Sequence, residues 1–267
     1  MRSSRADDGL PYLAAIERAR PRLGRLASTF VFLPTTGSTN DVALSRAGSD
    51  ASHGLVVVAD EQTAGRGRRG HTWFSPSGAG LYVSVVVAPT TAVDPPRATA
   101  LLTLTAGVAL AEGIAAASGL DVDVKWPNDL YVARRKIAGV LAEGASGAQV
   151  VLGYGINIAP AAYPPALGDR ATSLESELGR EVDRVHVLVE TLAALARRYE
   201  DLLAGRFDAI LDAWRARAPA ASGARVAWTT NAGALSGVTA GIDDQGALLV
   251  RIDGRVERIV AGEVAWL

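Results

Sequence analysis

The residues of this chain best suited to chemistry form a short loop in which arginine and glycine alternate. Residues 65–70 read GRGRRG, directly after a predicted strand, and His71, Trp73 and Phe74 follow. Guanidinium groups bind phosphate or carboxylate oxygens through paired hydrogen bonds, and glycine lets the backbone approach a ligand closely. This segment, called the arginine loop below, therefore predicts a site for an anionic, phosphate-bearing ligand. It is not a Walker A loop, because no Gly-Lys-Ser/Thr sequence follows it.

The arginine loop has two other interpretations, a solvated basic turn or an arginine–glycine segment that contacts RNA. The net charge of −1 and the lack of a second basic stripe argue against nucleic acid. Six residues with three glycines and three like charges should not hold one conformation without a bound anion. We therefore predict that residues 64–73 are poorly ordered in the free protein.

Three further segments place polar groups where predicted elements begin or end. Residues 125–129 (KWPND), called the lysine turn below, put a cation and turn-forming polar groups at the end of an apolar strand. Residues 153–157 (GYGIN) end another apolar strand, and residues 38–40 (STN) fit the start of a helix. Taken alone, each has a simpler explanation. The lysine turn could be a solvated strand end, residues 153–157 a close-packed or bulged strand, and residues 38–40 a helix cap.

Several kinds of active site are excluded or disfavoured by composition. The chain contains no cysteine, which excludes a disulfide framework, a thiolate metal site and a cysteine nucleophile. His53, His71 and His186 are far apart in sequence and lack the spacing of zinc ligands. No G-x-S-x-G segment occurs, so a hydrolase nucleophile has no support.

The composition indicates a soluble globular protein. A chain of 267 residues, 49% of them hydrophobic and 21% charged, can bury one good core with room for a small second domain. With a net charge of −1, any anion site must be local. We find no apolar run that approaches the roughly 20 residues of a membrane span, and the first 27 residues lack the apolar segment of a secretory signal. We expect a cytoplasmic protein without a membrane partner.

Hydrophobic periodicity predicts a mixed α+β domain followed by an all-β one. The short spacing of the strand pair 136–143 and 149–158 predicts an antiparallel meander. After residue 222, five short strand candidates separated by Gly, Asn and Asp predict a β-barrel of about 45 residues. The remaining predicted strands are 29–33, 55–59, 81–88 and 122–126, and the predicted helices are 11–27, 38 to a stop at Gly48, 95–117, 183–203 and 207–218.

Although each segment alone is ambiguous, their order resembles that of the biotin protein ligase family. The match runs from TGSTN (36–40) through EQTA (61–64), the arginine loop, WFSP (73–76), the lysine turn and KIAGVLAE (136–143) to GYGIN (153–157). It is close over residues 33–160 and looser through ATSL (171–174) into the C-terminal strands. The resemblance implies a mixed sheet flanked by helices, related to class II aminoacyl-tRNA synthetases, with an SH3-like β-barrel at the C-terminus. The implied division is a helical extension (1–28), a biotin- and ATP-binding catalytic domain (29–220) and the SH3-like domain (221–267).

The resemblance also assigns roles around biotin. One group of residues matches positions that hydrogen-bond the ureido head of biotin or line its pocket: Ser38, Thr39, Asn40, Gln62, Gly153 and Gly155. Arg66 and Arg68 match a loop that folds over the biotin carboxylate and the phosphates, and Gly65 and Gly67 allow close backbone approach.

Other matched positions concern the nucleotide. Lys125 matches a lysine at the carboxyl–phosphate junction, and we expect Arg68 and Lys125 to be the catalytic residues. Trp73 matches a tryptophan that packs on adenine, and Asn157 an amide that reads the adenine edge. We also expect Asn128, with Arg66 and Arg68, to bind ATP and the adenylate.

The implied reaction uses biotin and ATP as substrates, with Mg²⁺ on the phosphates. The implied partner is the biotin carboxyl carrier domain of a biotin-dependent carboxylase. Some family members carry an N-terminal winged helix that binds an operator, and about 30 residues before the catalytic domain are too few for that module. We therefore expect a dedicated ligase that does not bind DNA, as a monomer or homodimer. The main rivals are a lipoate–protein ligase, whose Arg-Gly-Gly-rich signature is not found here, and a non-catalytic RNA-binding module.

Overall fold

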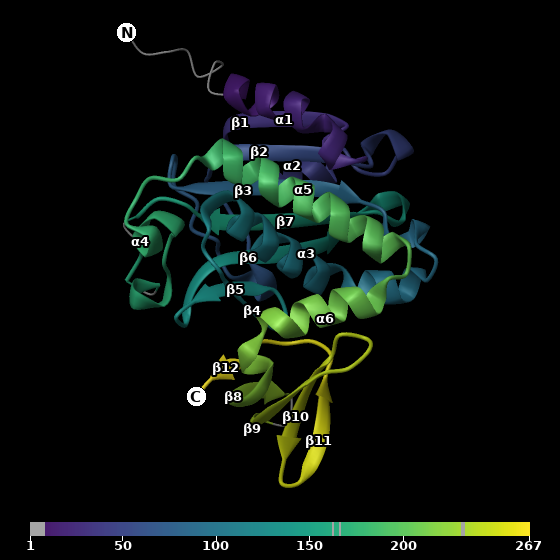
Figure 1. Ribbon diagram of the computed structural model, residues 1–267, viewed down its shortest axis with the longest axis vertical. Coiled ribbons are helices and arrows are strands. Elements are labelled where there is room, and N and C mark those ends of the chain that lie inside the picture. Colours follow the sequence, from purple (N-terminus) through teal and green to yellow (C-terminus); the bar gives the residue numbers. More distant parts are fainter. Residues whose placement is uncertain (1–8, 162, 166, 231–232) are drawn as a thin grey trace.

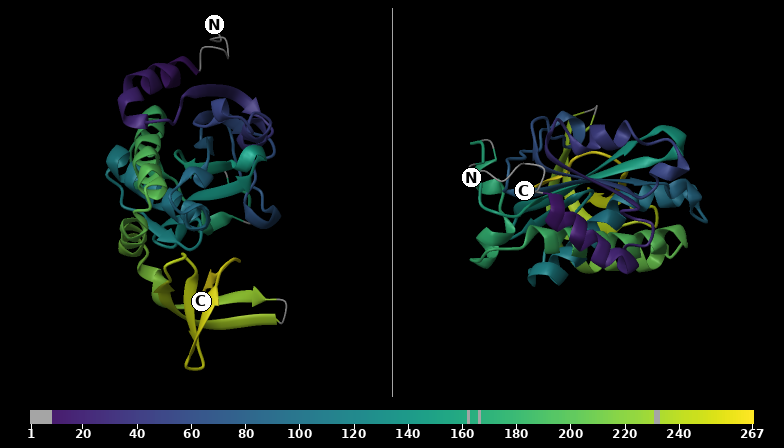
Figure 2. Two further views of the ribbon diagram at one scale, coloured as in Figure 1. Left: turned by 90° about the vertical axis from the view of Figure 1, so that its right-hand side faces the viewer. Right: turned by 90° about the horizontal axis from the view of Figure 1, so that it is seen from above.

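The computed structural model describes residues 9–161, 163–165, 167–230 and 233–267. The chain forms a seven-stranded mixed sheet with helices on both faces, and a smaller five-stranded unit lies at its lower end (Figures 1 and 2). This arrangement confirms the predicted α+β class with a small all-β unit at the C-terminus. The predicted division into domains stays a prediction, and residues 1–8 of the predicted N-terminal extension lie outside the described residues.

The large sheet brings segments that are distant in sequence next to one another. Its strand order is β1-β2-β3-β7-β6-β5-β4. The β1–β2 pair is parallel and every other neighbouring pair is antiparallel, so the predicted meander of β6 and β7 is confirmed. The seven strands are β1 (Thr29–Thr36), β2 (Leu55–Gln62), β3 (Gly80–Val87), β4 (Asp123–Lys125), β5 (Asp129–Val132), β6 (Arg135–Gly144) and β7 (Val150–Asn157).

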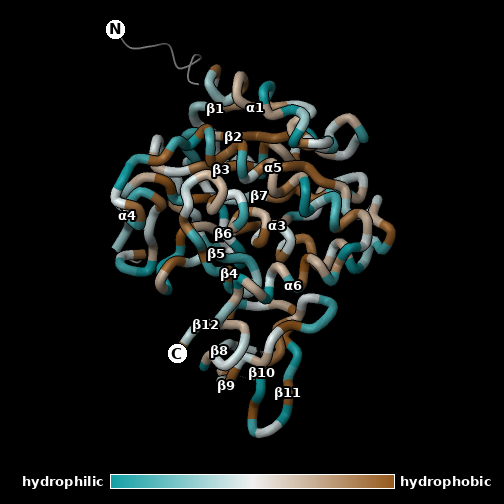
Figure 3. Tube along the Cα trace, in the orientation of Figure 1, coloured by the Kyte–Doolittle hydropathy of each residue, from teal (hydrophilic) through white to brown (hydrophobic). Residues whose placement is uncertain are grey.

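The central strands are apolar on both faces because helices cover both. Every residue of β3 is buried, and Figure 3 shows hydrophobic residues concentrated along β2 and β3. The long helix α3 and the helix α1 both pack against α5. Helix α2 lies on the other face of the sheet, where it contacts β2, β3 and β7. The helices are α1 (Leu10–Leu23), α2 (Thr39–Leu44), α3 (Pro95–Ser118), α4 (Leu174–Leu178), α5 (Arg184–Leu203) and α6 (Phe207–Arg217).

Helix α3 corrects one expectation. Its start at Pro95 and its end at Gly119, in the left-handed conformation, agree with the sequence signals. However, its 24 residues are long and apolar enough to cross a membrane, contrary to our reading of the sequence. The apolar stretch is 67% buried inside the fold, and its packing against α5, α6 and the sheet accounts for its composition.

Three local predictions differ from the structure. The helix after residue 38 ends at Leu44 rather than at Gly48, which lies in the following loop. Helix α1 ends at Leu23, before Gly24, rather than at residue 27. Strand β5 and the short helix α4 were not predicted, because each is too short to show a hydrophobic period.

The C-terminal unit is a five-stranded antiparallel sheet of order β11-β10-β9-β8-β12. Its strands match the five predicted candidates. It is tied to the large sheet, because the Trp126 indole donates to the carbonyl of Gly246 at 2.9 Å. The strands are β8 (Ser222–Thr230), β9 (Gly233–Ile242), β10 (Leu248–Ile252), β11 (Arg255–Ile259) and β12 (Ala265–Trp266).

Candidate active site

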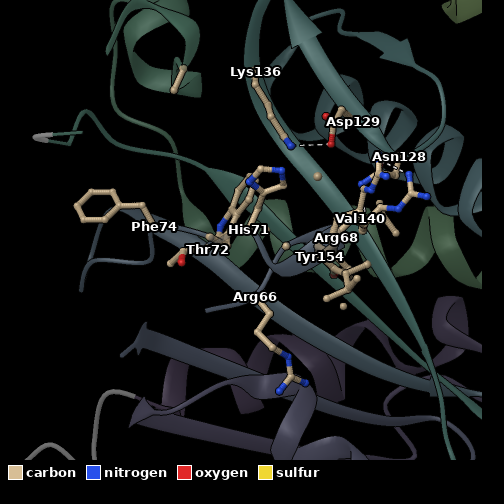
Figure 4. A pocket seen from close by; sticks show the side chains of 18 of the residues that line it. Arg66, Arg68, His71, Thr72, Phe74, Asn128, Asp129, Lys136, Val140 and Tyr154 are labelled. Carbon is tan, nitrogen blue, oxygen red and sulfur yellow. Dashed lines mark hydrogen bonds and ion pairs between the residues drawn. The ribbon is translucent and has the colours of Figure 1, made fainter. Parts of the chain in front are cut away.

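The four segments singled out in the sequence meet around a single cavity of about 330 Å³ (Figure 4). Its floor is formed by β6 and β7, and its rim by the arginine loop, the lysine turn and the C-terminal residues 262–264. All but one of the predicted site residues line it, namely Ser38, Thr39, Asn40, Gln62, Arg66, Gly67, Arg68, Trp73, Lys125, Asn128, Gly153, Gly155 and Asn157.

The exception is Gly65, which does not line the cavity. Its carbonyl accepts a hydrogen bond from the Trp73 amide at 2.9 Å. A Cβ at this position would lie 2.5 Å from the Trp73 carbonyl oxygen and 2.6 Å from Ser75 Oγ. Glycine is therefore needed at position 65 to close the loop, and the structure gives it no contact with a ligand in the cavity.

Part of the cavity is lined by neutral polar groups. The side-chain oxygen of Gln62, Oε1, accepts hydrogen bonds from the Thr39 backbone amide at 2.8 Å and from the Thr39 hydroxyl at 3.0 Å. The Ser84 hydroxyl oxygen, on β3, lies 2.8 Å from Thr39 Oγ1 and 2.5 Å from Asn40 Oδ1. Ser38, the N-cap of α2, and Thr39 and Asn40 in its first turn are all buried. Such a buried network holds its groups in fixed directions and suits a small neutral ligand with donors and acceptors.

Two acidic residues that we did not predict orient Arg66. Its guanidinium forms an ion pair with Asp41 and, at 2.9 Å, with Glu143. Glu143 also accepts a hydrogen bond from Asn40 Nδ2 at 2.5 Å. Figure 4 shows Arg66 pointing away from Arg68, toward α2. Glu143 is the last residue of the KIAGVLAE segment, so the motif contained it, but nothing in the sequence indicated its partner.

Arg68 is held differently, by neutral groups. Its guanidinium donates to Asn128 Oδ1 at 3.1 Å and, more weakly, to the Gly262 carbonyl at 3.4 Å. Asn128 itself is fixed because its Nδ2 donates to the Val140 carbonyl at 2.7 Å. Burial lowers the pKa of Arg68, although the guanidinium stays charged. The structure thus connects the arginine loop to the lysine turn through one side chain.

The arginine loop is a hydrogen-bonded hairpin. The Gly67 amide donates to the His71 carbonyl at 2.7 Å, and Arg66 pairs with Thr72 as an isolated bridge. Arg69 has a φ of 56°, in the left-handed region that residues other than glycine rarely adopt. Whether the hairpin persists without a ligand stays a prediction for hydrogen exchange.

Trp73 packs flat on the floor of the cavity. A Cβ at Gly155 would lie 2.3 Å from its indole nitrogen, and one at Gly139 would lie 3.2 Å from Cζ3 of the ring. The Lys136 ammonium, 5.3 Å from the ring centroid, faces the indole and is paired with Asp129 at 2.6 Å (Figure 4). Neighbouring glycines therefore make room for a flat aromatic surface.

Lys125 and Asn157 also line the cavity. The Lys125 ammonium is half-buried, and burial lowers its pKa. Asn157 Nδ2 donates to the Thr172 carbonyl at 2.9 Å, which leaves its oxygen available to a ligand. Asp129 and Lys136, which line the cavity and were not predicted as site residues, lie within motifs quoted from the sequence.

Cations outnumber anions around the cavity. The lining carboxylates are Asp129 and Glu263, whereas the lining cations are Arg66, Arg68, Arg69, Lys125, Lys136 and Arg170. The chain as a whole carries a charge of −1, so this excess of cations is local to the cavity, as we expected of any anion site. Within the described ranges, no group of three or more His, Cys, Asp or Glu residues is arranged to hold a metal ion.

Comparisons with known proteins agree with the resemblance noted in the sequence. Residues 32–157 match the "Biotin/lipoate A/B protein ligase family" and residues 221–266 match the "Biotin protein ligase C terminal domain". The chain is 37% identical over 238 residues to the "Biotin--[acetyl-CoA-carboxylase] ligase" of Mycobacterium tuberculosis, covering 87% of this chain and 86% of that protein. It is 35% identical over 240 residues to the "Bifunctional ligase/repressor BirA" of Bacillus subtilis, covering 88% of this chain and 73% of that protein.

A solved structure supports the fold over nearly the whole chain. The biotin protein ligase from Aquifex aeolicus in complex with biotin and ATP superposes with a TM-score of 0.78 at 27% identity. The superposition covers 90% of this chain and 99% of that chain. The similarity therefore extends through both the large sheet and the C-terminal unit.

Proposed function

The chain belongs to the biotin protein ligase family, and from that premise we propose how its own residues join biotin to ATP and then to a carrier protein. The enzyme activates biotin with ATP to biotinyl-5′-AMP and transfers biotin to a lysine of a biotin-dependent carboxylase. The observation that carries the residue roles is that a polar hydrogen-bond network around Thr39, Asn40 and Gln62 and a group of cations line the same cavity. A neutral ring system fits the polar network, and a carboxylate and phosphates fit the cations.

In the first step, a biotin carboxylate oxygen attacks the α-phosphorus of ATP and pyrophosphate leaves. Both reactants are anionic, so fixed positive charges lower the electrostatic barrier and align the two groups. We assign this role to Arg68 and Lys125, with Arg66 on the loop side. ATP would enter as its magnesium complex, in which Mg²⁺ would neutralise part of the charge of the phosphates and of the leaving pyrophosphate.

Recognition of the two substrates falls to the remaining groups. The hydrogen-bonded set around Thr39, Asn40 and Gln62 would bind the ureido head of biotin. Gly153 and Gly155 would complete this pocket by leaving room for Asn40 and Trp73 to pack against β7. Trp73 offers a flat face for adenine and the Asn157 oxygen accepts from its amino group.

In the second step, a neutral lysine amine of the carrier attacks the acyl carbon of biotinyl-5′-AMP. The C–N bond forms as the bond between the acyl carbon and the phosphate oxygen breaks, and AMP leaves. No covalent enzyme intermediate is needed, which is compatible with a chain that lacks cysteine. Positioning and charge stabilisation supply most of the catalysis in this scheme.

A transfer assay tests the function directly. The protein is incubated with MgATP, a biotin carboxyl carrier domain and labelled biotin or labelled lipoate. We expect label on the carrier from biotin and none from lipoate. A carrier whose acceptor lysine is changed to arginine serves as the control and should remain unlabelled. Transfer of lipoate alone, or no transfer with any carrier, would contradict the proposal.

We further propose that the partner is the carrier domain of a carboxylase, and that the enzyme works in the cytoplasm without binding DNA, as a monomer or homodimer. The near-neutral charge gives no long-range attraction to DNA. The apolar face of α1, with Tyr12 and Ile16, is buried against the catalytic domain. Light scattering measures the assembly state, and sequence-specific DNA binding at physiological salt would refute the ligase-only role.

A further inference from the structure

The ammonium of Lys125 faces two aromatic rings. Its Nζ lies 4.4 Å from the ring centroid of Trp266 and 5.2 Å from that of Tyr131. The two rings meet edge to face, with centroids 4.8 Å apart and an interplanar angle of 62°. In the part of the chain that the structure describes, we find no ion pair or hydrogen bond to this ammonium.

The larger of these rings comes from the C-terminal unit. Trp266 lies on β12, where it pairs with Val226 of β8, and the next amide, of Leu267, donates to the Arg225 carbonyl at 3.0 Å. Lys125 ends β4 of the large sheet, and Figure 1 shows β12 just below β4 and β5. The Trp266 ring therefore reaches from one sheet to a catalytic cation of the other.

A ring holds a cation without cancelling its charge. The face of an aromatic ring attracts an ammonium group, most strongly for tryptophan, but carries no net charge. Lys136, which also lines the cavity, is instead paired with the carboxylate of Asp129 at 2.6 Å, and its charge is largely compensated. Lys125, by contrast, forms no ion pair among the described residues, although Asp129 and Glu263 attract it at longer range, and the two rings restrain its position.

We propose that Trp266 is a positioning residue for Lys125, through which the docked C-terminal unit aims this ammonium at the carboxyl–phosphate junction during adenylation. The inference rests on the proposed function, because it takes Lys125 to contact the biotin carboxylate and the α-phosphate during adenylation. It makes β12 part of the adenylation site as well as of the C-terminal fold.

The kinetic test compares three variants in single-turnover formation of biotinyl-5′-AMP. Trp266→Leu removes the ring, Trp266→Phe keeps a weaker one, and Leu267→Ala is the control, because Leu267 is the adjacent residue and is exposed. We expect Trp266→Leu to slow adenylation by roughly 2- to 30-fold with little change in biotin affinity, Trp266→Phe to recover most of the rate, and the control to match wild type.

A double-mutant comparison separates positioning from general damage. If Trp266 acts through Lys125, Trp266→Leu should add no further loss in an enzyme that already carries Lys125→Met. An equal loss in both backgrounds would overturn the inference. So would a Trp266→Leu enzyme as fast as wild type.

A spectroscopic readout covers the case in which Trp266→Leu fails to fold. Only two of the chain's 27 lysine and arginine residues are lysines, Lys125 and Lys136. An NMR spectrum of protein labelled with ¹³Cε-lysine therefore shows two side-chain signals, which Lys136→Arg assigns. We expect the Lys125 signal to be shifted upfield by the Trp266 ring in wild type and to move in Trp266→Phe, while the Lys136 signal stays in place.

The outcomes for the two proposals are distinct. A folded wild-type protein that forms no adenylate would overturn the proposed function, and the role of Lys125 with it. An active wild type whose Lys125 signal lacks the ring shift would overturn only the contact with Trp266.

Discussion

Replacing Gly153 with alanine should weaken biotin binding by pushing Asn40 out of its network. A Cβ at position 153 would lie 2.2 Å from Asn40 Oδ1 and 2.9 Å from its Cγ. The amide has no free direction to move, because Oδ1 accepts from Ser84 at 2.5 Å and Nδ2 donates to Glu143 at 2.5 Å. Relief of the clash therefore breaks at least one of these two hydrogen bonds.

The size of the effect follows from those bonds. A neutral hydrogen bond contributes about 0.5–1.5 kcal/mol and one to a charged group about 1.5–3 kcal/mol. Overpacking a tight site costs about 1–3 kcal/mol by itself. If Asn40 binds biotin, we expect the affinity for biotin to fall by about 1–3 kcal/mol, or roughly 5- to 150-fold.

Isothermal titration calorimetry with biotin measures this loss. Gly144→Ala, near the end of β6, is the matched control, because its Cβ would have no atom within 4 Å. In an Asn40→Ala background the clash disappears, so Gly153→Ala should then cost little more. A Gly153→Ala protein with wild-type affinity and thermal stability would refute the assignment of Asn40 to the biotin site.

Three further predictions concern the loop, the lysine turn and the outer helices. Hydrogen exchange across residues 64–73 should slow markedly when biotin and ATP are added; equal exchange with and without them would refute the ordering of the arginine loop. Asn128→Ala should release Arg68 and speed escape of biotinyl-5′-AMP roughly tenfold or more, as followed by stopped-flow dissociation, whereas an unchanged rate would show that Asn128 does not act through Arg68. The hydrogen bond from Arg22 lowers the pKa of Glu190 below its ordinary value of 4.5, so this pair stabilises the fold above that pH, and the contribution is lost as pH falls through the lower, folded-state pKa. Because Arg22 is half-exposed, the loss should be below about 1 kcal/mol, and Glu190→Gln should abolish it in acid unfolding measured by circular dichroism.

The local features of this molecule were readable in the sequence because they depend on nearby residues. The start of α3 at Pro95 and its end at Gly119 follow from backbone chemistry within one turn. The five short C-terminal strands follow from turn residues at regular spacing. The residues that line the cavity were also partly predictable, because the predicted site residues, with the exception of Gly65, all line it.

The partners of the site residues were not predictable, because they depend on strand order. Ser84 meets Asn40 only because β3 lies between β2 and β7. A serine inside the otherwise apolar strand 81–88 was the available signal, since a buried hydroxyl needs a hydrogen-bond partner. Trp266 gave no such signal, because its contact with Lys125 arises from how one sheet docks on another.

The two residues expected to be catalytic share a physical property that neither motif reveals. Arg66 and Lys136 each form an ion pair with a carboxylate, so their charges are largely compensated before a ligand arrives. Arg68 is held by an amide and a carbonyl oxygen, and Lys125 by aromatic faces. Burial lowers the pKa of both Arg68 and Lys125, and Asp129 and Glu263 oppose this shift without forming an ion pair with either cation among the described residues. An incoming carboxylate and phosphate would add directly paired anions, so the cations that bind most productively are those whose position is fixed by neutral partners.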